Sequence, residues 1–127
     1  MRIGINASGM LGDPDLKRLE TQARTAAEQG FASFWLAQAT TIDALTVIAA
    51  LGRSVPNIDF GTAVIPTYPR HPTTLAGQAM TTQAIIDGRL TLGIGLSHKP
   101  MIEGLYGMSF DKPIRHMREY LSILMPM

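Results

Sequence analysis

The stretch best suited to holding a ligand is Asp87–Ser97, where a turn signal is followed by an apolar run that ends among small residues. The run 90–96 is too short and too rich in glycine for a helix, which predicts a buried strand. Ligands of α/β proteins gather beyond the carboxyl ends of parallel strands. Gly93 and Gly95 leave room there for a ligand or another backbone, although strand glycines also occur where they only relieve crowding inside a barrel.

Several other kinds of chemical site are excluded by the sequence. The chain has no cysteine, which removes disulfides, thiolate metal sites and thiol nucleophiles. A dinucleotide phosphate loop would need glycine where the chain has His98, and the Gly-Lys-Ser or Gly-Lys-Thr triplet of a Walker loop does not occur. Neither His71, before an expected helix, nor His116, on another, belongs to a ligand-like pattern, so we predict no metal site.

Composition limits the chain to one modest domain. The 127 residues are 46% hydrophobic and 17% charged, so we expect a single globular domain over residues 1–127. A net charge of +1 without a basic stripe gives no case for nucleic acid or for an anionic membrane surface. The N-terminus does not resemble a signal peptide and no 18-residue apolar run occurs, so we expect a soluble cytoplasmic protein whose partners are small molecules or protein chains.

The elements that position this stretch alternate along the chain. Apolar runs predict strands near 3–7, 31–37, 58–65 and 90–96. Capping signals and helical spacing predict helices from Asp13-Pro14 to Gly30, from about Thr41 to Gly52, from Pro72 to about Asp87, and from Asp111 and Pro113 through Leu124. His98 to Asp111 is expected to be a long loop and a candidate lid or pocket wall. Four strand–helix units at roughly 30-residue spacing predict a parallel α/β fold.

Seven short segments of the chain are informative through their order and spacing. They are Phe34–Gln38, Asp43–Thr46, Gly61–Val64, His71-Pro72, Gly88–Gly95, Glu103–Gly107, and an expected helix with Arg115, Arg118 and Glu119. In this order and spacing, the whole chain from Arg2 onward resembles the bacterial luciferase-like monooxygenase superfamily. It is most similar to the branch that uses the deazaflavin coenzyme F420, because Phe34–Gln38 leads to Asp43–Thr46. No single segment is specific, so the resemblance depends on their order and spacing.

The resemblance implies an eight-stranded (β/α) barrel with a flavin or deazaflavin at its C-terminal mouth. A TIM barrel of this kind needs about 250 residues. The four units of this chain correspond to half of a TIM (β/α)8 barrel, with four strands and four helices and without the C-terminal half. In the family, contacts to the cofactor phosphate lie largely on later loops, which this chain does not contain.

The resemblance also implies cofactor contacts at the end of the third strand. There the family has a non-proline cis peptide that presses against the cofactor ring, and the matching positions are Ala63 and Val64. An ordinary trans strand end is the alternative. Thr67, in the loop that follows, would line the same mouth. Gln38, after the second strand, is a further candidate cofactor contact. It stands where many relatives have an acidic residue near the cofactor ring, and its amide can form hydrogen bonds but cannot exchange a proton.

A second group of implied contacts follows the fourth strand. Gly95, Leu96 and Ser97 match the loop that the family packs against the cofactor. His98 is a weak candidate proton donor, because an imidazole titrates near neutral pH, and a solvent-facing loop histidine is the alternative. Asn6, at the end of the first strand, is a candidate substrate contact or a strand-end cap.

Two functions are compatible with these patterns. The first is an oxidoreductase that transfers hydride between coenzyme F420, or FMN as the alternative, and a small organic substrate. The second is a non-catalytic half-barrel that only folds and self-associates. A four-strand sheet has unpaired edges at its first and fourth strands, and its inner face is expected to carry Ile5, Phe34 or Trp35, Val64, and Leu92 or Ile94. Exposed edges and apolar faces favour association, so we expect a homodimer or a higher homo-oligomer.

Overall fold

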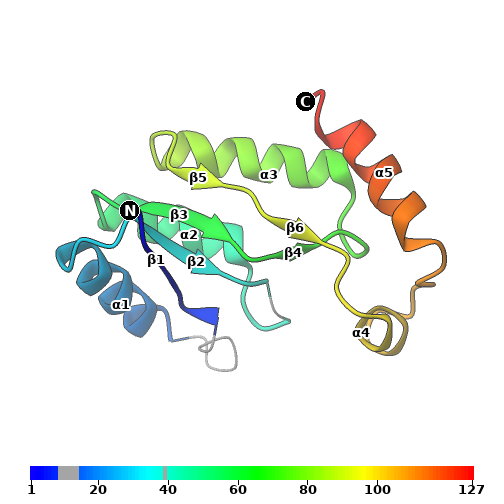
Figure 1. Cartoon of the computed structure of the whole chain (residues 1–127), viewed down its shortest axis with the longest axis horizontal. Helices are drawn as coiled ribbons and strands as arrows, with labels where there is room; N and C mark the ends of the chain where they lie inside the picture. Colours follow the sequence, from blue (N-terminus) through cyan, green and yellow to red (C-terminus); the bar gives the residue numbers. More distant parts are fainter. Residues whose placement is uncertain (9–14, 39) are drawn as a thin grey trace.

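The structure, a computed structural model, describes residues 1–8, 15–38 and 40–127, which form a parallel α/β fold (Figure 1). The elements in chain order are β1 (Gly4–Asn6), α1 (Leu16–Glu28), β2 (Ser33–Leu36), α2 (Ala44–Ser54), β3 (Asp59–Thr62), β4 (Ile65–Pro66), α3 (Pro72–Ile85), β5 (Leu90–Thr91), β6 (Ile94–Gly95), α4 (Lys99–Gly104) and α5 (Pro113–Leu124).

All strand pairs in the described residues are parallel, as the strand–helix alternation predicts. One sheet has the order β1-β2-β3-β5, and a second ladder pairs β4 with β6. The predicted third strand is therefore divided into β3 and β4, and the predicted fourth into β5 and β6. The two ladders continue each other along the chain, so the four predicted strand positions are confirmed and each of the last two contains a break.

Thr62, the last residue of β3, and Gly93, between β5 and β6, contact each other where the two strand positions break. The Thr62 hydroxyl donates to the Gly93 carbonyl oxygen at 2.8 Å and accepts from the Gly93 amide at 2.8 Å. The second of these bonds pairs the Gly93 amide, while the Gly93 carbonyl also accepts from the Ile65 amide at 2.9 Å, so both backbone groups of Gly93 are satisfied at the break. A Cβ at position 93 would lie 2.0 Å from the Thr62 carbonyl oxygen, so this approach requires glycine.

The first two helices begin close to the expected positions. The predicted cap at Asp13 and Pro14 lies outside the described residues, and α1 has Asp15 as its N-cap, whose carboxylate accepts from the Arg18 amide at 3.1 Å. Gly30 follows α1 with φ +81°, which only glycine adopts readily, so this predicted end is confirmed. Thr41 was the wrong cap for α2, because Asp43 caps the helix two residues later.

The expected long loop from His98 to Asp111 is wrong in part, because it contains the short helix α4. Pro100 fits the first turn of α4, and Ile102 on its inner side is fully buried, which fixes the segment on the domain. The expected cap Asp111 is also wrong, since α5 has Lys112 at its N-cap in the left-handed region, with φ 50°. Pro113 opens α5 as predicted.

Helices α1 and α2 cover one face of the sheet. Phe34, Leu36 and Phe60 are fully buried on that face and pack with apolar residues of α1 and α2. Ile5 pairs in register with Phe34, and side chains of paired residues in a parallel sheet share a face. The expectation that Ile5 lies on the inner face is therefore wrong.

The opposite, inner face is carried by Trp35, and Phe34 was the incorrect alternative. Trp35 pairs with Asn6 and Gly61, and its ring lies over the space that a side chain at Gly61 would fill. Leu92 and Ile94 instead pack on the helix side, in a second cluster with Leu45, Ile65, Leu75 and Tyr120. Of the expected inner-face residues, Trp35 and Val64 remain.

Candidate functional site

The C-terminal ends of the second, third and fourth strand positions bring five of the predicted site residues together. The amide of Ala63 donates to the Leu36 carbonyl at 2.8 Å, and the amide of Gln38 donates to the Val64 carbonyl at 3.1 Å. On the other side, the Thr67 amide donates to the Gly95 carbonyl at 2.9 Å. The peptide bond between Ala63 and Val64 is cis, as the resemblance implies.

Val64 is the apolar side chain that this arrangement leaves open. It is 39% exposed, although the residues on either side of it, Ala63 and Ile65, are half-buried and fully buried. A Cβ at Gly95 would lie 2.6 Å from Val64 Cγ2. Gly93 and Gly95 therefore make room for the neighbouring strand segment, with Gly93 admitting its backbone and Gly95 its Val64 side chain.

The side-chain amide of Gln38 holds the start of α2. Its Nε2 donates to the Ile42 carbonyl at 3.0 Å, and its Oε1 accepts from the Ala44 amide at 2.8 Å. These bonds shape the connection between β2 and α2, next to the Val64 carbonyl. A contact between Gln38 and a cofactor stays a prediction.

Asn6 lies at the end of β1 and shapes the backbone there. Its Oδ1 accepts from the Ser8 amide at 2.9 Å and also from the Ser8 hydroxyl. The Ser8 hydroxyl in turn accepts from the Ala37 amide at 3.1 Å. This is the strand-end cap that the sequence allowed, and a substrate contact by the exposed Asn6 stays a prediction.

Leu96, Ser97 and His98 connect β6 to α4. Leu96 and Ser97 are half-buried, and Ser97 adopts a left-handed conformation with φ 62°. His98 is exposed and is the N-cap of α4, but its side chain makes no capping hydrogen bond. The imidazole is therefore accessible to solvent, which fits both a loop histidine and a candidate proton donor.

Thr67 is placed differently from the residues around it. Its side chain is 1% exposed, and its hydroxyl lies 2.9 Å from Nε2 of His116 on α5. Burial lowers the pKa of His116 below its usual value, an effect that the charge of Glu119 partly offsets. In the sequence, His116 belongs to no ligand-like pattern, and its one signal is its position four residues before Tyr120 on the same helix face.

A second polar contact ties the loop after β4 to α2. Arg70 and Asp43 form an ion pair with an N–O distance of 2.6 Å, and Tyr120 donates to the Arg70 carbonyl at 2.9 Å. Burial by itself would raise the pKa of Asp43. Hydrogen bonds from Thr46 and the charge of Arg70 outweigh it, so the pKa lies below its usual value.

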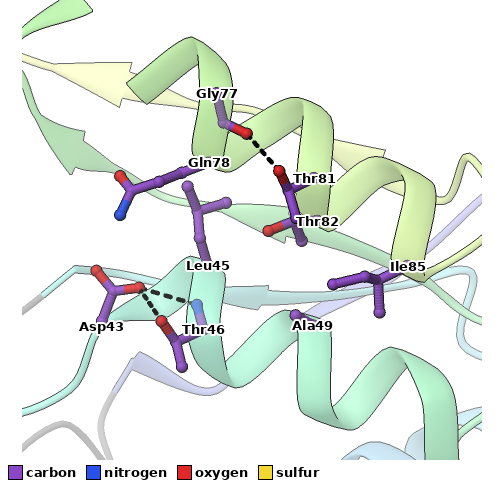
Figure 2. A pocket seen from close by; sticks show the side chains of 9 residues that line it. All are labelled: Asp43, Leu45, Thr46, Ala49, Gly77, Gln78, Thr81, Thr82 and Ile85. Atoms are coloured by element: carbon purple, nitrogen blue, oxygen red, sulfur yellow. Dashed lines mark hydrogen bonds between the residues drawn. The ribbon is translucent and has the colours of Figure 1, made fainter. Parts of the chain in front are cut away.

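Two of the hollows outside this cluster of strand ends lie beside α3. A groove of about 330 Å³ runs between α2 and α3 and is lined by Asp43, Leu45, Thr46, Ala49, Gly77, Gln78, Thr81, Thr82 and Ile85 (Figure 2). An apolar groove of about 340 Å³ lies between α3 and α5. Neither contains a predicted site residue.

No group of three or more histidine, aspartate or glutamate side chains that could hold a metal ion occurs among the described residues. None of the helices in the described part of the chain is long and apolar enough to cross a membrane.

Comparisons with known proteins place this arrangement in context. A family model described as "Luciferase-like monooxygenase" matches residues 1–127. A Mycobacterium tuberculosis protein whose name assigns it to the coenzyme F420-dependent oxidoreductases is 35% identical over 124 residues, which are 98% of this chain and 35% of that protein.

Solved structures show the same fold. The oxygenating constituent of the Pseudomonas putida 3,6-diketocamphane monooxygenase, in complex with FMN, superposes with a TM-score of 0.84 at 23% identity. The coenzyme F420-dependent tetrahydromethanopterin reductase of Methanopyrus kandleri gives 0.78 at 18% identity. In both cases the match covers 98% of this chain and 38% of the other. The chain thus spans well under half the length of the proteins it matches.

Proposed function

Because the chain belongs to the luciferase-like monooxygenase family, we propose that it contributes the ring-binding part of a deazaflavin- or flavin-dependent oxidoreductase. Hydride would pass between the bound cofactor and a small organic substrate. The observation that carries the proposal is the segment Ala63–Val64, which presents an exposed apolar side chain at the C-terminal strand ends.

The residues at this end of the sheet suit a planar, largely apolar ring. Val64 is exposed beside two glycines, and half-buried Trp35 lies on the same inner face. A mostly apolar lining with a few placed polar groups is the usual character of a cofactor pocket. Val64, with the backbone of Ala63 and Gly95, would support the ring, and Ser97 and His98 would lie at the rim.

When bound, a deazaflavin or flavin supplies the hydride chemistry, and the protein binds and orients it. Val64 would exclude water from one side of the ring. His98 is the titratable side chain next to Ser97 and is the candidate proton donor. Gln38 would keep the loop after β2 in shape through its two hydrogen bonds rather than transfer a proton.

Coenzyme F420 is our first choice of cofactor and FMN the second. The preference rests on the name of the mycobacterial relative, which is 35% identical, whereas the FMN complex comes from a structure at 23% identity.

Binding of each cofactor to the purified protein, measured by equilibrium dialysis, tests the proposal. Val64→Asp places a charge against the ring and should weaken binding at least about tenfold, the equivalent of about 1.4 kcal/mol. Ile85→Asp is the matched control, because Ile85 is 38% exposed but lies on α3 in the groove of Figure 2. Equal losses in both variants, or no binding by the wild type, would refute the ring site and leave the non-catalytic half-barrel, which family membership does not favour.

We also propose that the chain self-associates as a homodimer or a higher homo-oligomer. β1 and β5 each pair with a single neighbour, and the inner face that carries Trp35 and Val64 is open. A second copy that covers these edges would bury upward of about 1,000 Å² per chain, an interface of the large obligate class. Sedimentation equilibrium at low micromolar concentration should show the oligomer, and a well-folded monomer would contradict the proposal.

A further inference from the structure

His116 on α5 contacts the loop that follows β4, although 49 positions separate it from Thr67 in the sequence. Its Nε2 lies 2.9 Å from the Thr67 hydroxyl, and Thr67 is 1% exposed. A buried hydroxyl that loses its partner is left unsatisfied at a cost in free energy, and this cost stabilises the pair.

Aromatic packing holds the imidazole against the same loop. The rings of Tyr68 and His116 stack with centroids 3.9 Å apart and an interplanar angle of 9°. Phe110, just before α5, stacks on Tyr68 with centroids 5.1 Å apart, and the Tyr120 hydroxyl donates to the Arg70 carbonyl. Three residues of the loop, 67, 68 and 70, are therefore held from α5 and the segment before it.

The loop is continuous with the segment that presents Val64. The Ile65 amide donates to the Gly93 carbonyl, just before β6, and the Thr67 amide donates to the Gly95 carbonyl in β6, both at 2.9 Å. Fixing Thr67 from α5 therefore limits where Val64 can lie three residues earlier.

We propose that His116 is a positioning residue for the ring-binding segment: through Thr67 it sets the course of the loop that presents Val64. The inference rests on the proposed function, since it names what holds that function's apolar contact in place. His116 itself touches no part of the inner face among the contacts described and transfers no proton in this role.

Paired substitutions separate the hydrogen bond from the packing. His116→Phe keeps a stacking ring but removes Nε2, whereas His116→Gln loses the ring and keeps an amide group of similar reach. Thr67→Val removes the hydroxyl at nearly constant volume, and Thr67→Ser keeps it. If the bond positions the loop, His116→Phe and Thr67→Val should behave alike, while His116→Gln and Thr67→Ser should stay close to the wild type.

Two measurements test these variants on the whole chain. The first is the dissociation constant of coenzyme F420 or FMN, followed by quenching of Trp35, the single tryptophan. His116→Phe and Thr67→Val should each weaken binding about tenfold, the effect of one lost hydrogen bond to a buried group, and the double variant should be no weaker than either. His116→Gln and Thr67→Ser should remain within about threefold of the wild type.

The second measurement is hydrogen exchange at the Thr67 amide, which needs no cofactor. His116→Phe should accelerate this exchange at least about fivefold, while the Ile48 amide in α2, which reports global unfolding, stays within about twofold. A wild type that binds neither cofactor refutes the proposed function, and the exchange data then decide the role of His116 alone. Unchanged exchange at Thr67 in His116→Phe, or equal effects in His116→Phe and His116→Gln, would overturn the inference.

Discussion

Arg89 connects the ends of three chain segments at the N-terminal side of the sheet. Its guanidinium donates to the Val55 and Ile58 carbonyls at 3.1 and 2.8 Å and to the Gly52 carbonyl, and its Nε donates to the Ile86 carbonyl at 3.0 Å. These acceptors belong to the C-terminal ends of α2 and α3 and to the approach to β3. The fixed fork of a guanidinium presents five N–H donors over a wide span, whereas a lysine ammonium presents three donors from a single point.

Arg89→Met keeps a side chain of similar length and removes all four bonds. Hydrogen bonds to charged groups contribute about 1.5–3 kcal/mol each, but four bonds from one half-buried side chain are not additive, because water replaces part of the loss. We therefore expect the free energy of unfolding to fall by about 3 kcal/mol. With an unfolding entropy of about 2.1 cal/mol/K per residue over 127 residues, this corresponds to a fall in Tm of about 11 °C.

Urea unfolding followed by circular dichroism measures this change, with Arg89→Lys as an intermediate that we expect to lose about half as much. The exposed Arg118→Met is the matched control and should change the free energy of unfolding by less than about 0.5 kcal/mol. A free energy of unfolding for Arg89→Met within about 1 kcal/mol of the wild type would show that the four contacts do not hold the helix ends.

Two further predictions concern packing and pH. Gly93→Ala places a Cβ 2.0 Å from a backbone oxygen, so the free energy of unfolding, measured with urea, should fall by about 2 kcal/mol. Gly77 is exposed on α3, and a Cβ there would meet nothing within 4 Å, so Gly77→Ala should raise the free energy of unfolding by about 0.5 kcal/mol. Loss of stability in both, or in neither, would contradict the close approach. The pKa of Asp43 is lowered in the folded state, so its ionised form stabilises the fold above the unfolded pKa and this contribution disappears as the pH falls through the folded pKa. The free energies of unfolding of the wild type and Asp43→Asn should therefore converge as the pH falls below about 4. A difference between them that stays constant from pH 7 to pH 2 would exclude this linkage.

The architecture was predictable because local signals agreed with the global pattern. Gly30 ends α1, Pro72 and Pro113 open α3 and α5, and the four apolar runs became parallel strands. Each signal is local: proline fixes φ at a helix start, and glycine allows a positive φ at a helix end. The capping signals, the turn glycines and the hydrophobic pattern all specify the same element boundaries, and such agreement makes a fold predictable from its sequence.

Other features depended on contacts that no local pattern encodes. Asp43 rather than Thr41 caps α2, and both are ordinary capping residues at plausible spacing. The short helix α4 packs on the domain through the buried Ile102. The glycines at 104 and 107 favour a loop in this segment, so the sequence does not indicate the helix. The faces of the strands were also partly misread, because buried parallel strands lack strict alternation, so only the register shows that Ile5 accompanies Phe34.

One part of the candidate site was predictable from the sequence and another part was not. The segment Ala63–Val64 came from the family resemblance, and the structure confirms its cis peptide. The partnership of Thr67 with His116 joins positions 49 apart, and nothing in the sequence near either residue points to the other. Long-range side-chain pairs of this kind depend on how α5 packs, and periodicity alone does not determine that.

The stretch Gly88–Gly95 shows why the glycines and the arginine occur together. Arg89 holds the helix ends at one end of the sheet, and Gly93 and Gly95 admit the neighbouring strand segment at the other. A side chain at position 95 would collide with Val64 before it reached any ligand. In the proposed site, the glycines would act on a cofactor ring indirectly, by allowing Val64 to occupy the position from which it would touch the ring. Substitution at Gly95 should consequently alter cofactor binding in the same direction as substitution at Val64, although Gly95 itself contributes no side chain.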